Sequence, residues 1–301
     1  MLRVAYFGPQ GTFTEQAARE LSPRDEFVAA DSVPAALRAV RENRADAACV
    51  PVENSVEGAV AATLDSLAEE EPLVAVAESL LPIRFSVLSR AADAEVRTIA
   101  SHPHALAQVR DWLATNLPDA RQVAASSTAA AAVGVHDGDY DAAVAAPIAA
   151  RHYPLNVLAT DVADVSDACT RFLLVRPPGS LPEPTGADRT SIVAATTNRT
   201  GALAGLLAEL ASRGVNLTRL DARPTRNTFG EYRFFIDFEG HIAEPRVGEA
   251  MTALRRRCDL RFLGSHRRAD GVAPSVAPGT GNDEFTAAAT WLSRVRAGEL
   301  A

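Results

Sequence analysis

The sequence predicts an α/β protein in which a two-lobed α/β domain precedes a smaller βαββαβ domain. Three observations support this prediction. Strand and helix signals alternate in two similar rounds over residues 1–176, a Pro- and Gly-rich stretch interrupts the chain at 176–186, and a different order of elements follows. The 301 residues suffice for two or three domains. We expect domains at 1–178 and 188–267, then a linker and a short C-terminal helix at 269–301.

The two rounds share landmarks at a constant spacing. Ser32 and Ser127, each before a helix signal, lie 95 positions apart, and so do Asp46 and Asp141, each before an apolar strand. A duplication would give two similar lobes with largely parallel sheets, and small ligands would bind where the carboxyl ends of the strands face an inter-lobe cleft. Such matches also arise by chance in an Ala-rich chain, so both interpretations stay open.

Residues 188–267 predict one βαββαβ unit of ferredoxin-like type. A strand at 191–197 precedes a helix with leucines at 203, 206, 207 and 210, which Gly214 would close. Strands at 215–223 and 232–238 follow, joined by a hairpin connection at 224–231, and a helix at 245–258 and a strand at 260–265 complete the unit. Apolar residues from Phe285 to Val295 recur at helical spacing, which favours a short helix that docks on the body or frays.

All 30 basic residues are Arg, and this excludes large classes of chemistry. Without Lys the chain has no P-loop lysine, no kinase strand lysine and no Schiff base to pyridoxal phosphate or to a carbonyl substrate. A net charge of −8 without an Arg-rich aromatic stripe argues against nucleic acid as a partner. No signal peptide or membrane-spanning segment is predicted, and three scattered Cys fit a reducing compartment. We therefore expect a cytoplasmic protein.

Two loops that follow predicted strands carry polar groups with open interpretations. Gly8-Pro-Gln-Gly-Thr12 would either cradle an anion with its amides and hydroxyls or form a plain strand-to-helix turn. Pro51-Val-Glu-Asn-Ser-Val-Glu-Gly58 places a carboxylate, an amide and a hydroxyl at consecutive positions. It is either an acid and hydrogen-bonding cluster or a helix-capping turn.

Three further segments have a structural and a chemical interpretation each. Ser101-His-Pro-His104 contains an H-x-H pattern, which can bind a metal ion. No third ligand lies at a spacing typical of a metal site, so we favour a histidine that caps a helix near Ala105 and expect no metal. Cys169 lacks a nearby His base, which favours an inert buried thiol over a nucleophile. Thr170-Arg-Phe172 opens an apolar strand, where alternation puts Thr170 and Phe172 on one face and Arg171 on the other.

The order of these segments resembles that of prephenate dehydratases with a C-terminal ACT domain. The resemblance covers about residues 1–267 and rests on 8–15, 51–58, 101–103, 170–172, Gly201-Ala-Leu203 and Arg223-Pro224. It implies a two-lobed periplasmic-binding-like catalytic domain, conversion of prephenate to phenylpyruvate, water and carbon dioxide without a cofactor, and feedback by phenylalanine at the ACT domain. His104 stands where the family usually has Gln, which we expect to be tolerated at a cap.

The resemblance also implies roles for individual residues. Thr170 would be the essential catalytic group. A Thr hydroxyl is too weak an acid to give up a proton unaided, so we expect Thr170 to donate a hydrogen bond or to relay a proton. Glu53 is the nearest candidate partner for such a relay. Asn54 and Ser55 complete the implied catalytic set. The implied substrate-binding residues are Thr12, Gly11, Ser101, Arg171 and Phe172.

For regulation, two segments resemble the loops with which paired ACT domains bind phenylalanine. The residues concerned are Asn198, Gly201, Ala202, Leu203, Asn216, Asp221, Arg223 and Pro224. Asp221-Ala222 replaces the Glu-Ser common in the family, so we expect an altered affinity or selectivity. Binding across a dimer interface would require a homodimer or homotetramer. Two alternatives stay open: an arogenate dehydratase, and a non-enzymatic two-lobed binding protein fused to an amino-acid sensor.

Overall fold

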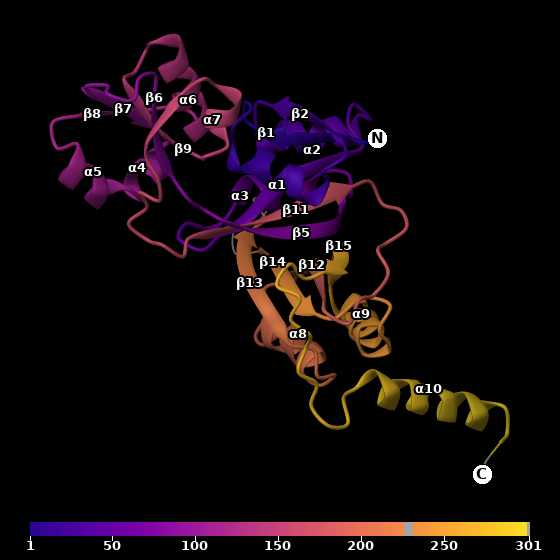
Figure 1. Cartoon of the computed structure of the whole chain (residues 1–301). Coiled ribbons are helices and arrows are strands. Elements are labelled where there is room, and N and C mark those ends of the chain that lie inside the picture. Colours follow the sequence, from indigo (N-terminus) through magenta and orange to yellow (C-terminus); the bar gives the residue numbers. More distant parts are fainter. Residues whose placement is uncertain (226–230, 300–301) are drawn as a thin grey trace. The chain divides into compact units, whose positions relative to one another are not determined.

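The computed structural model describes residues 1–225 and 231–299 and divides into two compact units (Figure 1). The first unit contains Met1–Ser66 and Ser79–Pro177, and the second contains Leu67–Glu78 and Pro178–Ala301. The short segment Leu67–Glu78 thus belongs with residues far along the chain, which no local pattern in the sequence indicates. Each unit is described by itself below.

The first lobe of the first unit is a sheet with helices around it. Its strands lie in the order β2-β1-β3-β11, and β4 pairs with β3. β1 is parallel to β2 and β3, whereas β11 is antiparallel to β3. The elements are β1 (Arg3–Phe7), α1 (Phe13–Leu21), β2 (Glu26–Ala30), α2 (Val33–Arg41), β3 (Ala47–Asn54), β4 (Gly58–Ala59), α3 (Ala61–Glu69) and β11 (Cys169–Arg176).

The second lobe has a five-stranded sheet in the order β10-β6-β9-β7-β8. β7 is parallel to β8 and β9, and β6 is antiparallel to β9. Its core includes Val87, Ile99, Leu113 and Val144. The elements are β6 (Ser86–Ser89), β7 (Thr98–Ser101), α4 (Pro103–Ala107), α5 (Arg110–Asn116), β8 (Arg121–Ala124), α6 (Thr128–Asp137), β9 (Ala142–Ala145), α7 (Ala149–His152) and β10 (Asn156–Ala159).

The strand registers establish the internal duplication. Val4 pairs with Phe27 and Ala47 in the first lobe, and Ile99 pairs with Gln122 and Ala142 in the second, so all three positions are shifted by 95. The landmark residues repeat as well. Ser32 caps α2 by accepting from the amide of Ala35, and Ser127 caps α6 by accepting from Ala130. Asp46 accepts from Arg3 N–H as Asp141 does from Thr98 N–H.

The second unit is the predicted βαββαβ domain with an added strand. Its strand order is β13-β14-β12-β15, and residues 74–78 at the start of β5 lie beside β15, where Gly264 pairs with Ala75. A Cβ on Gly264, whose φ is +138°, would lie 2.3 Å from the Ala75 carbonyl oxygen, so the close pairing requires glycine. The elements are β5 (Val74–Pro82), β12 (Asp188–Thr196), α8 (Ala202–Ala211), β13 (Leu217–Pro224), β14 (Tyr232–Glu239), α9 (Pro245–Arg257) and β15 (Asp259–Arg267).

Most of these elements agree with the expected ones to within a few residues, and the end of one helix differs. α8 ends at Ala211 rather than at Gly214, which takes φ +64° in the turn that follows. Five residues of the predicted hairpin connection, 226–230, lie outside the described part. The C-terminal helix forms as α10 (Asn282–Arg296), has no buried residue and leaves Trp291 exposed.

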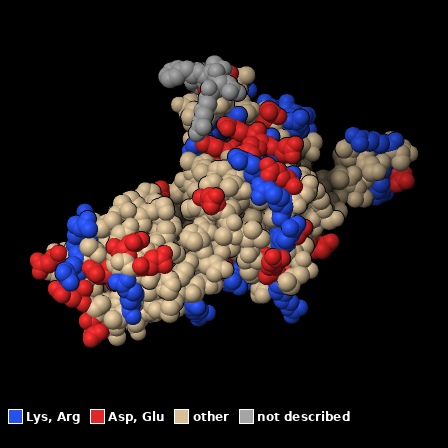
Figure 2. All heavy atoms as spheres, turned by 90° about the horizontal axis from the view of Figure 1, so that it is seen from above, with Lys and Arg blue, Asp and Glu red and all other residues tan. Residues whose placement is uncertain are grey.

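Charge is spread over the surface in both signs. On the described part of the face shown in Figure 2, acidic and basic side chains interleave rather than forming one basic patch, in keeping with the net charge of −8. Within residues 1–225 and 231–299, no helix is both long and apolar enough to span a membrane.

Candidate active site

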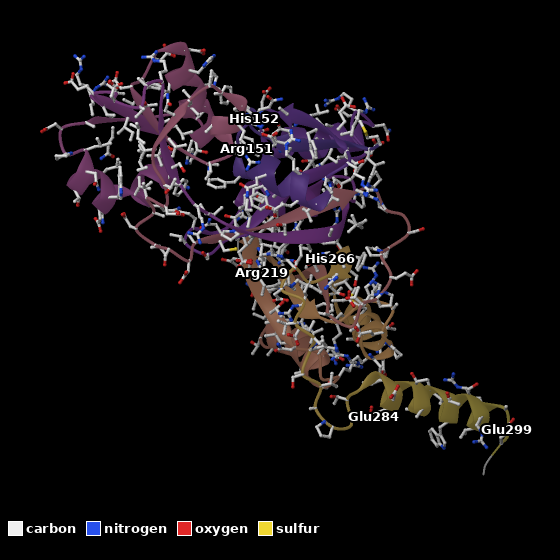
Figure 3. The ribbon with its side chains drawn as sticks, viewed as in Figure 1. Arg151, His152, Arg219, His266, Glu284 and Glu299 are labelled. Carbon is white, nitrogen blue, oxygen red and sulfur yellow. The ribbon has the colours of Figure 1, made fainter. Side chains whose placement is uncertain are left out.

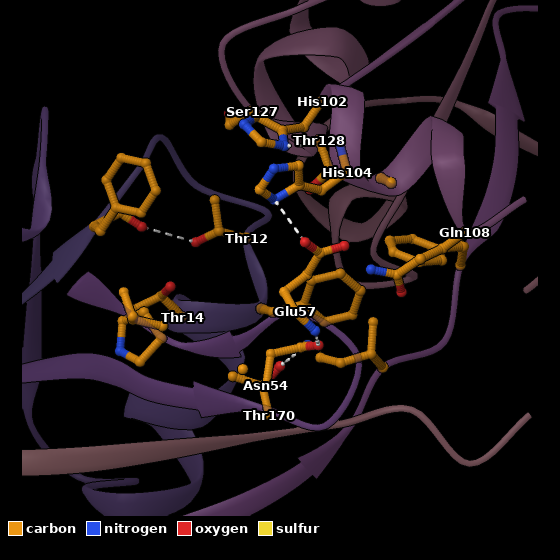
Figure 4. A pocket seen from close by; sticks show the side chains of 18 of the residues that line it. Thr12, Thr14, Asn54, Glu57, His102, His104, Gln108, Ser127, Thr128 and Thr170 are labelled. Carbon is orange, nitrogen blue, oxygen red and sulfur yellow. Dashed lines mark hydrogen bonds and ion pairs between the residues drawn. The ribbon is translucent and has the colours of Figure 1, made fainter. Parts of the chain in front are cut away.

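A cavity of about 470 Å³ lies between the two lobes of the first unit (Figure 4). Its volume is in the usual range for small-ligand sites. Residues at the carboxyl ends of β1, β3, β7 and β8 contribute to the wall, as expected for this class of fold. The polar lining residues are Thr12, Thr14, Asn54, Glu57, His102, His104, Gln108, Ser126, Ser127, Thr128 and Thr170, and the aromatic ones are Phe7, Phe13 and Phe85.

Thr170 and Asn54 face the cavity together from two paired strands. Thr170 on β11 lies opposite Asn54 on β3, and the Asn54 Nδ2 donates to Thr170 Oγ1 at 2.8 Å. The Asn54 Oδ1 accepts from the backbone amides of Val56 and Glu57 at 2.8 and 3.0 Å, which fixes the orientation of the side-chain amide. Thr170 therefore accepts from Asn54. Its own hydroxyl proton makes no hydrogen bond within the described residues and is available to a ligand.

The strand register places Glu53 away from this hydroxyl. Glu53 lies opposite Arg171, one residue along from the pair formed by Asn54 and Thr170, so Glu53 and Arg171 share the other face of the sheet. Neither residue lines the cavity. Phe172 follows a shift in the strand register after Arg171; it is fully buried and does not line the cavity either. Glu57, which the sequence motifs did not single out, is the carboxylate that lines the cavity. The geometry therefore does not support Glu53 as the partner of Thr170.

Ser55 and Ser101 have structural partners. The Ser55 hydroxyl accepts from the backbone amide of Cys169 at 2.9 Å, which joins the end of β3 to the start of β11. The buried Ser101 hydroxyl donates to the carbonyl of Val144 at 2.6 Å and joins β7 to β9. Both hydroxyls hold strands in place, and neither residue is part of the cavity wall.

The Gly8–Thr12 loop forms a capped strand-to-helix turn, the second of its two interpretations. The amide of Gly11 donates to the buried Glu15 carboxylate at 2.6 Å, so it is occupied by a group within the same segment. Thr12 caps α1 by accepting from Glu15 N–H, and its hydroxyl donates to the Phe7 carbonyl. A Cβ on Gly11 would lie 2.9 Å from the Cα of Ala149, so glycine is needed where this loop packs against α7.

Glu15 also connects the two lobes. Its carboxylate lies 3.1 Å from Nε2 of His152, which is labelled in Figure 3 and lies at the end of α7. The same carboxylate lies 2.8 Å from the guanidinium of Arg19. The Tyr153 hydroxyl donates to the carbonyl of Gln10 in the same loop. The loop thus acts as a contact between the lobes, while the side chain of Thr12 supplies part of the cavity wall.

The opposite wall comes from the second lobe. His102 caps α4, where its Nδ1 accepts from the backbone amide of His104 at 3.3 Å, so the predicted cap forms, two residues earlier than expected. The N-terminus of α6, from Ser126 to Thr128, also lines the cavity. Free amides and the helix dipole make such a terminus favourable for anions. The spacing of 95 identified Ser127 as a cap, but it gave no signal that this cap borders a cavity.

Few charged groups line the cavity. Glu57 is its one carboxylate, and no Arg is part of the wall in the portion that the structure describes. Burial is the larger and the neighbouring His104 the smaller of two causes that lower the pKa of His102. Together they outweigh Glu57, which acts in the opposite direction. Within the described residues no group of three or more His, Cys, Asp or Glu could hold a metal ion. Burial raises the pKa of the Cys169 thiol, which makes it a poor nucleophile.

In the second unit, two of the segments tied to phenylalanine binding lie at the same end of the sheet. Thr196 at the end of β12 and Pro224 at the end of β13 both pair with Tyr232 of β14, so the loop 198–203 and residues 221–224 lie at the same end of the sheet with one strand between them. Asp221 forms an ion pair at 2.5 Å with Arg219, labelled in Figure 3. Asn216 lies at the opposite end of β13, where its carbonyl accepts from Glu239 N–H. Within one chain it is far from the other segments.

Together, the fold and the cavity define a two-lobed α/β unit with a small-ligand site, on a chain that also carries a small βαββαβ domain. The sequence profile of the family described as prephenate dehydratase matches residues 4–179, and that of the ACT domain matches residues 190–256. The chain therefore belongs to the prephenate dehydratase family, with an ACT domain after the catalytic region.

Individual relatives agree with this assignment. A prephenate dehydratase from Amycolatopsis methanolica is 69% identical over 304 residues, which cover 100% of both chains. The crystal structure of a prephenate dehydratase in complex with L-Phe from Arthrobacter aurescens has a TM-score of 0.92 at 44% identity and covers 97% of this chain and 99% of its own. A third structure, described as a novel type of quorum quenching acylase, has a TM-score of 0.79 at 31% identity and covers 88% of this chain and 97% of its own.

Proposed function

We propose that this chain converts prephenate to phenylpyruvate, water and carbon dioxide, and that phenylalanine regulates it through the ACT domain. The observation that supports the activity best is the pair Asn54 and Thr170, which offers one hydroxyl proton to the cavity. We assign the reaction to residues 1–178 and the regulation to residues 188–267.

The chemistry requires little beyond help for a leaving group. The bond from C4 to its hydroxyl and the bond from C1 to its carboxylate both break, and the electron pair released at C1 completes the aromatic ring as hydroxide departs from C4. A donor within about 3 Å of the C4 oxygen stabilises the departing hydroxide, and such assistance contributes typically 10²–10⁴-fold. Thr170 is this donor, and Asn54 positions it. The hydroxide becomes water by taking a proton from solvent or through Thr170.

The remaining wall suits the two carboxylates and the ring of the substrate. The N-terminus of α6 at Ser126–Thr128 offers amides to one carboxylate. Phe13 and Phe85, which contact each other edge to face at 5.5 Å, provide an apolar surface for the ring. Apolar surroundings favour the loss of charge as carbon dioxide leaves.

For regulation, the relative from Arthrobacter aurescens was crystallised with L-Phe, which supports phenylalanine as the ligand of this ACT domain. We propose a site built from the loop with Asn198, Gly201, Ala202 and Leu203 and from Asp221, Arg223 and Pro224 on β13. Because Asn216 lies at the other end of β13, it joins such a site only from a second copy of the chain. We therefore propose a homodimer or homotetramer. Three free cysteines support a cytoplasmic location.

One assay tests the proposed function. Prephenate is added to the pure protein, with and without millimolar L-phenylalanine, and phenylpyruvate is followed by its absorbance. We expect turnover, and inhibition by phenylalanine accompanied by heat of binding in calorimetry. Equal or faster turnover of arogenate would instead favour an arogenate dehydratase. Binding of prephenate without turnover would favour a binding protein, and the related acylase shows that the fold alone does not decide the reaction.

A further inference from the structure

His104 and Glu57 face each other across the catalytic cavity. His104 lies on α4 in the second lobe, and Glu57 lies in the turn between β3 and β4 in the first. The His104 Nδ1 is 3.8 Å from a Glu57 carboxylate oxygen (Figure 4). Both side chains line the cavity and keep contact with water, with 64% and 40% of their surfaces exposed. Water can therefore solvate a charge on either side chain.

Of the two imidazoles in the cavity wall, His104 is the one suited to be a cation. His102 uses its Nδ1 lone pair to accept the backbone amide of His104, so that nitrogen is not protonated. Burial and the repulsion of His104 also lower the pKa of His102. His104 has no such backbone role for its ring. Its Nδ1 faces Glu57, and its Nε2 is free of hydrogen bonds among the described residues.

The substrate of the proposed reaction is a dianion, and the wall needs positive charge to hold it. No Arg lines the described part of the cavity, and the chain contains no Lys. We propose that protonated His104 binds a substrate carboxylate through Nε2–H while Glu57 orients the ring from Nδ1. This inference rests on the proposed function, since it needs a dianionic ligand in this cavity. It gives a binding role to a residue at which the chain departs from the Gln usual in its family.

The charged groups around His104 predict how binding depends on pH. Glu57 faces it from the β3–β4 turn, His102 lies 4.9 Å away between ring centres, and the positive end of α6 borders the same cavity. An ordinary imidazole loses its proton between about pH 5 and 8, whereas both substrate carboxylates stay ionised throughout that range. KM should therefore rise with pH as His104 becomes neutral, and kcat should change little.

Steady-state kinetics with prephenate from about pH 5.5 to 8.5, a range that brackets the titration of an ordinary imidazole, test the proposal. A charge-assisted hydrogen bond to a partly exposed carboxylate is expected to change KM by about tenfold. His104→Gln should hold KM near the high value at all pH values, and His104→Arg, a permanent cation, near the low value. Glu57→Gln removes the carboxylate that orients the ring and should raise KM. The control His136→Gln alters an exposed histidine at the end of α6, outside the cavity, and should behave as wild type.

The outcomes separate this inference from the proposed function. A KM profile in His104→Gln that rises with pH as in wild type overturns the role of His104, and so does a rising KM in His104→Arg. Absence of phenylpyruvate from the wild-type protein overturns the proposed reaction instead. In that case calorimetric titration of prephenate into Thr170→Val, with and without His104→Gln, still measures the contribution of His104 to binding and its dependence on pH.

Discussion

Replacing Asn54 by Asp should disable the enzyme while leaving its fold intact. The Asn54 Oδ1 accepts two backbone amides, and a carboxylate oxygen of Asp replaces it in both bonds. The Nδ2 that donates to Thr170 at 2.8 Å becomes the second carboxylate oxygen, which can only accept. The Thr170 hydroxyl then donates to this new carboxylate and no longer to the substrate.

The size of this effect follows from the new hydrogen bond. A hydrogen bond to a charged group is worth about 1.5–3 kcal/mol, so a value of about 2 kcal/mol reduces the fraction of Thr170 hydroxyls that face the cavity by about 30-fold. A negative charge beside the departing hydroxide adds to this loss. We expect the turnover number to fall at least about 30-fold, with the melting temperature within a few degrees of wild type.

The assay is phenylpyruvate formation at saturating prephenate, with circular dichroism melts of both proteins. Asn54→Ala serves as a comparison, since it also removes the two backbone contacts and should lower both stability and activity. If Asn54→Asp keeps its turnover number within about threefold of wild type, the orientation of the Thr170 hydroxyl by Asn54 does not matter for the reaction.

Two further predictions use the duplicated lobes. Ser127→Ala and Ser32→Ala each remove an N-cap at equivalent positions, and each should lower the unfolding free energy by about 1 kcal/mol in denaturant melts. Only Ser127→Ala should also raise KM, because Ser127 borders the cavity and Ser32 does not. An equal change in KM for both variants would contradict this. Burial alone would raise the pKa of Asp141, but hydrogen bonds from the Thr98 side chain and backbone outweigh it and lower the pKa. The stabilisation by Asp141 is thus present above its unfolded-state pKa and lost as the pH falls through the folded-state value, so the stability gap between wild type and Asp141→Asn should close in acid; a gap independent of pH from about 7 to 3 would contradict the assignment.

The fold was predictable because local signals repeat in this chain. Ser32 and Ser127 each supply a capping hydroxyl, and Asp46 and Asp141 each accept an amide at the start of an equivalent strand, β1 and β7. What was not predictable depends on pairing between distant segments. The pairing of Gly264 with Ala75 brings residues 67–78 into the second unit, and nothing near residue 75 indicates it.

The site shows the same division between local and distant information. The family resemblance implies roles for Thr170 and Asn54, and the structure joins them by a hydrogen bond across 116 positions of sequence. Motifs could not reveal that the amide of Gly11 is taken by Glu15, or that register places Glu53 on the far face of its strand. The sequence does not distinguish Glu57 from Glu53, because only the turn after β3 directs Glu57 into the cavity.

The most direct test of the central claim is the turnover number of Thr170→Val with prephenate, measured beside Thr170→Ser. Valine keeps the shape of the buried side chain and removes the hydroxyl, whereas serine keeps the hydroxyl. Because such a donor usually contributes about 10²–10⁴-fold, we expect valine to lower the turnover number by at least the smaller of these factors and serine to retain substantial activity. An unchanged turnover number in Thr170→Val would contradict the assignment of Thr170 as the group that assists the departing hydroxide.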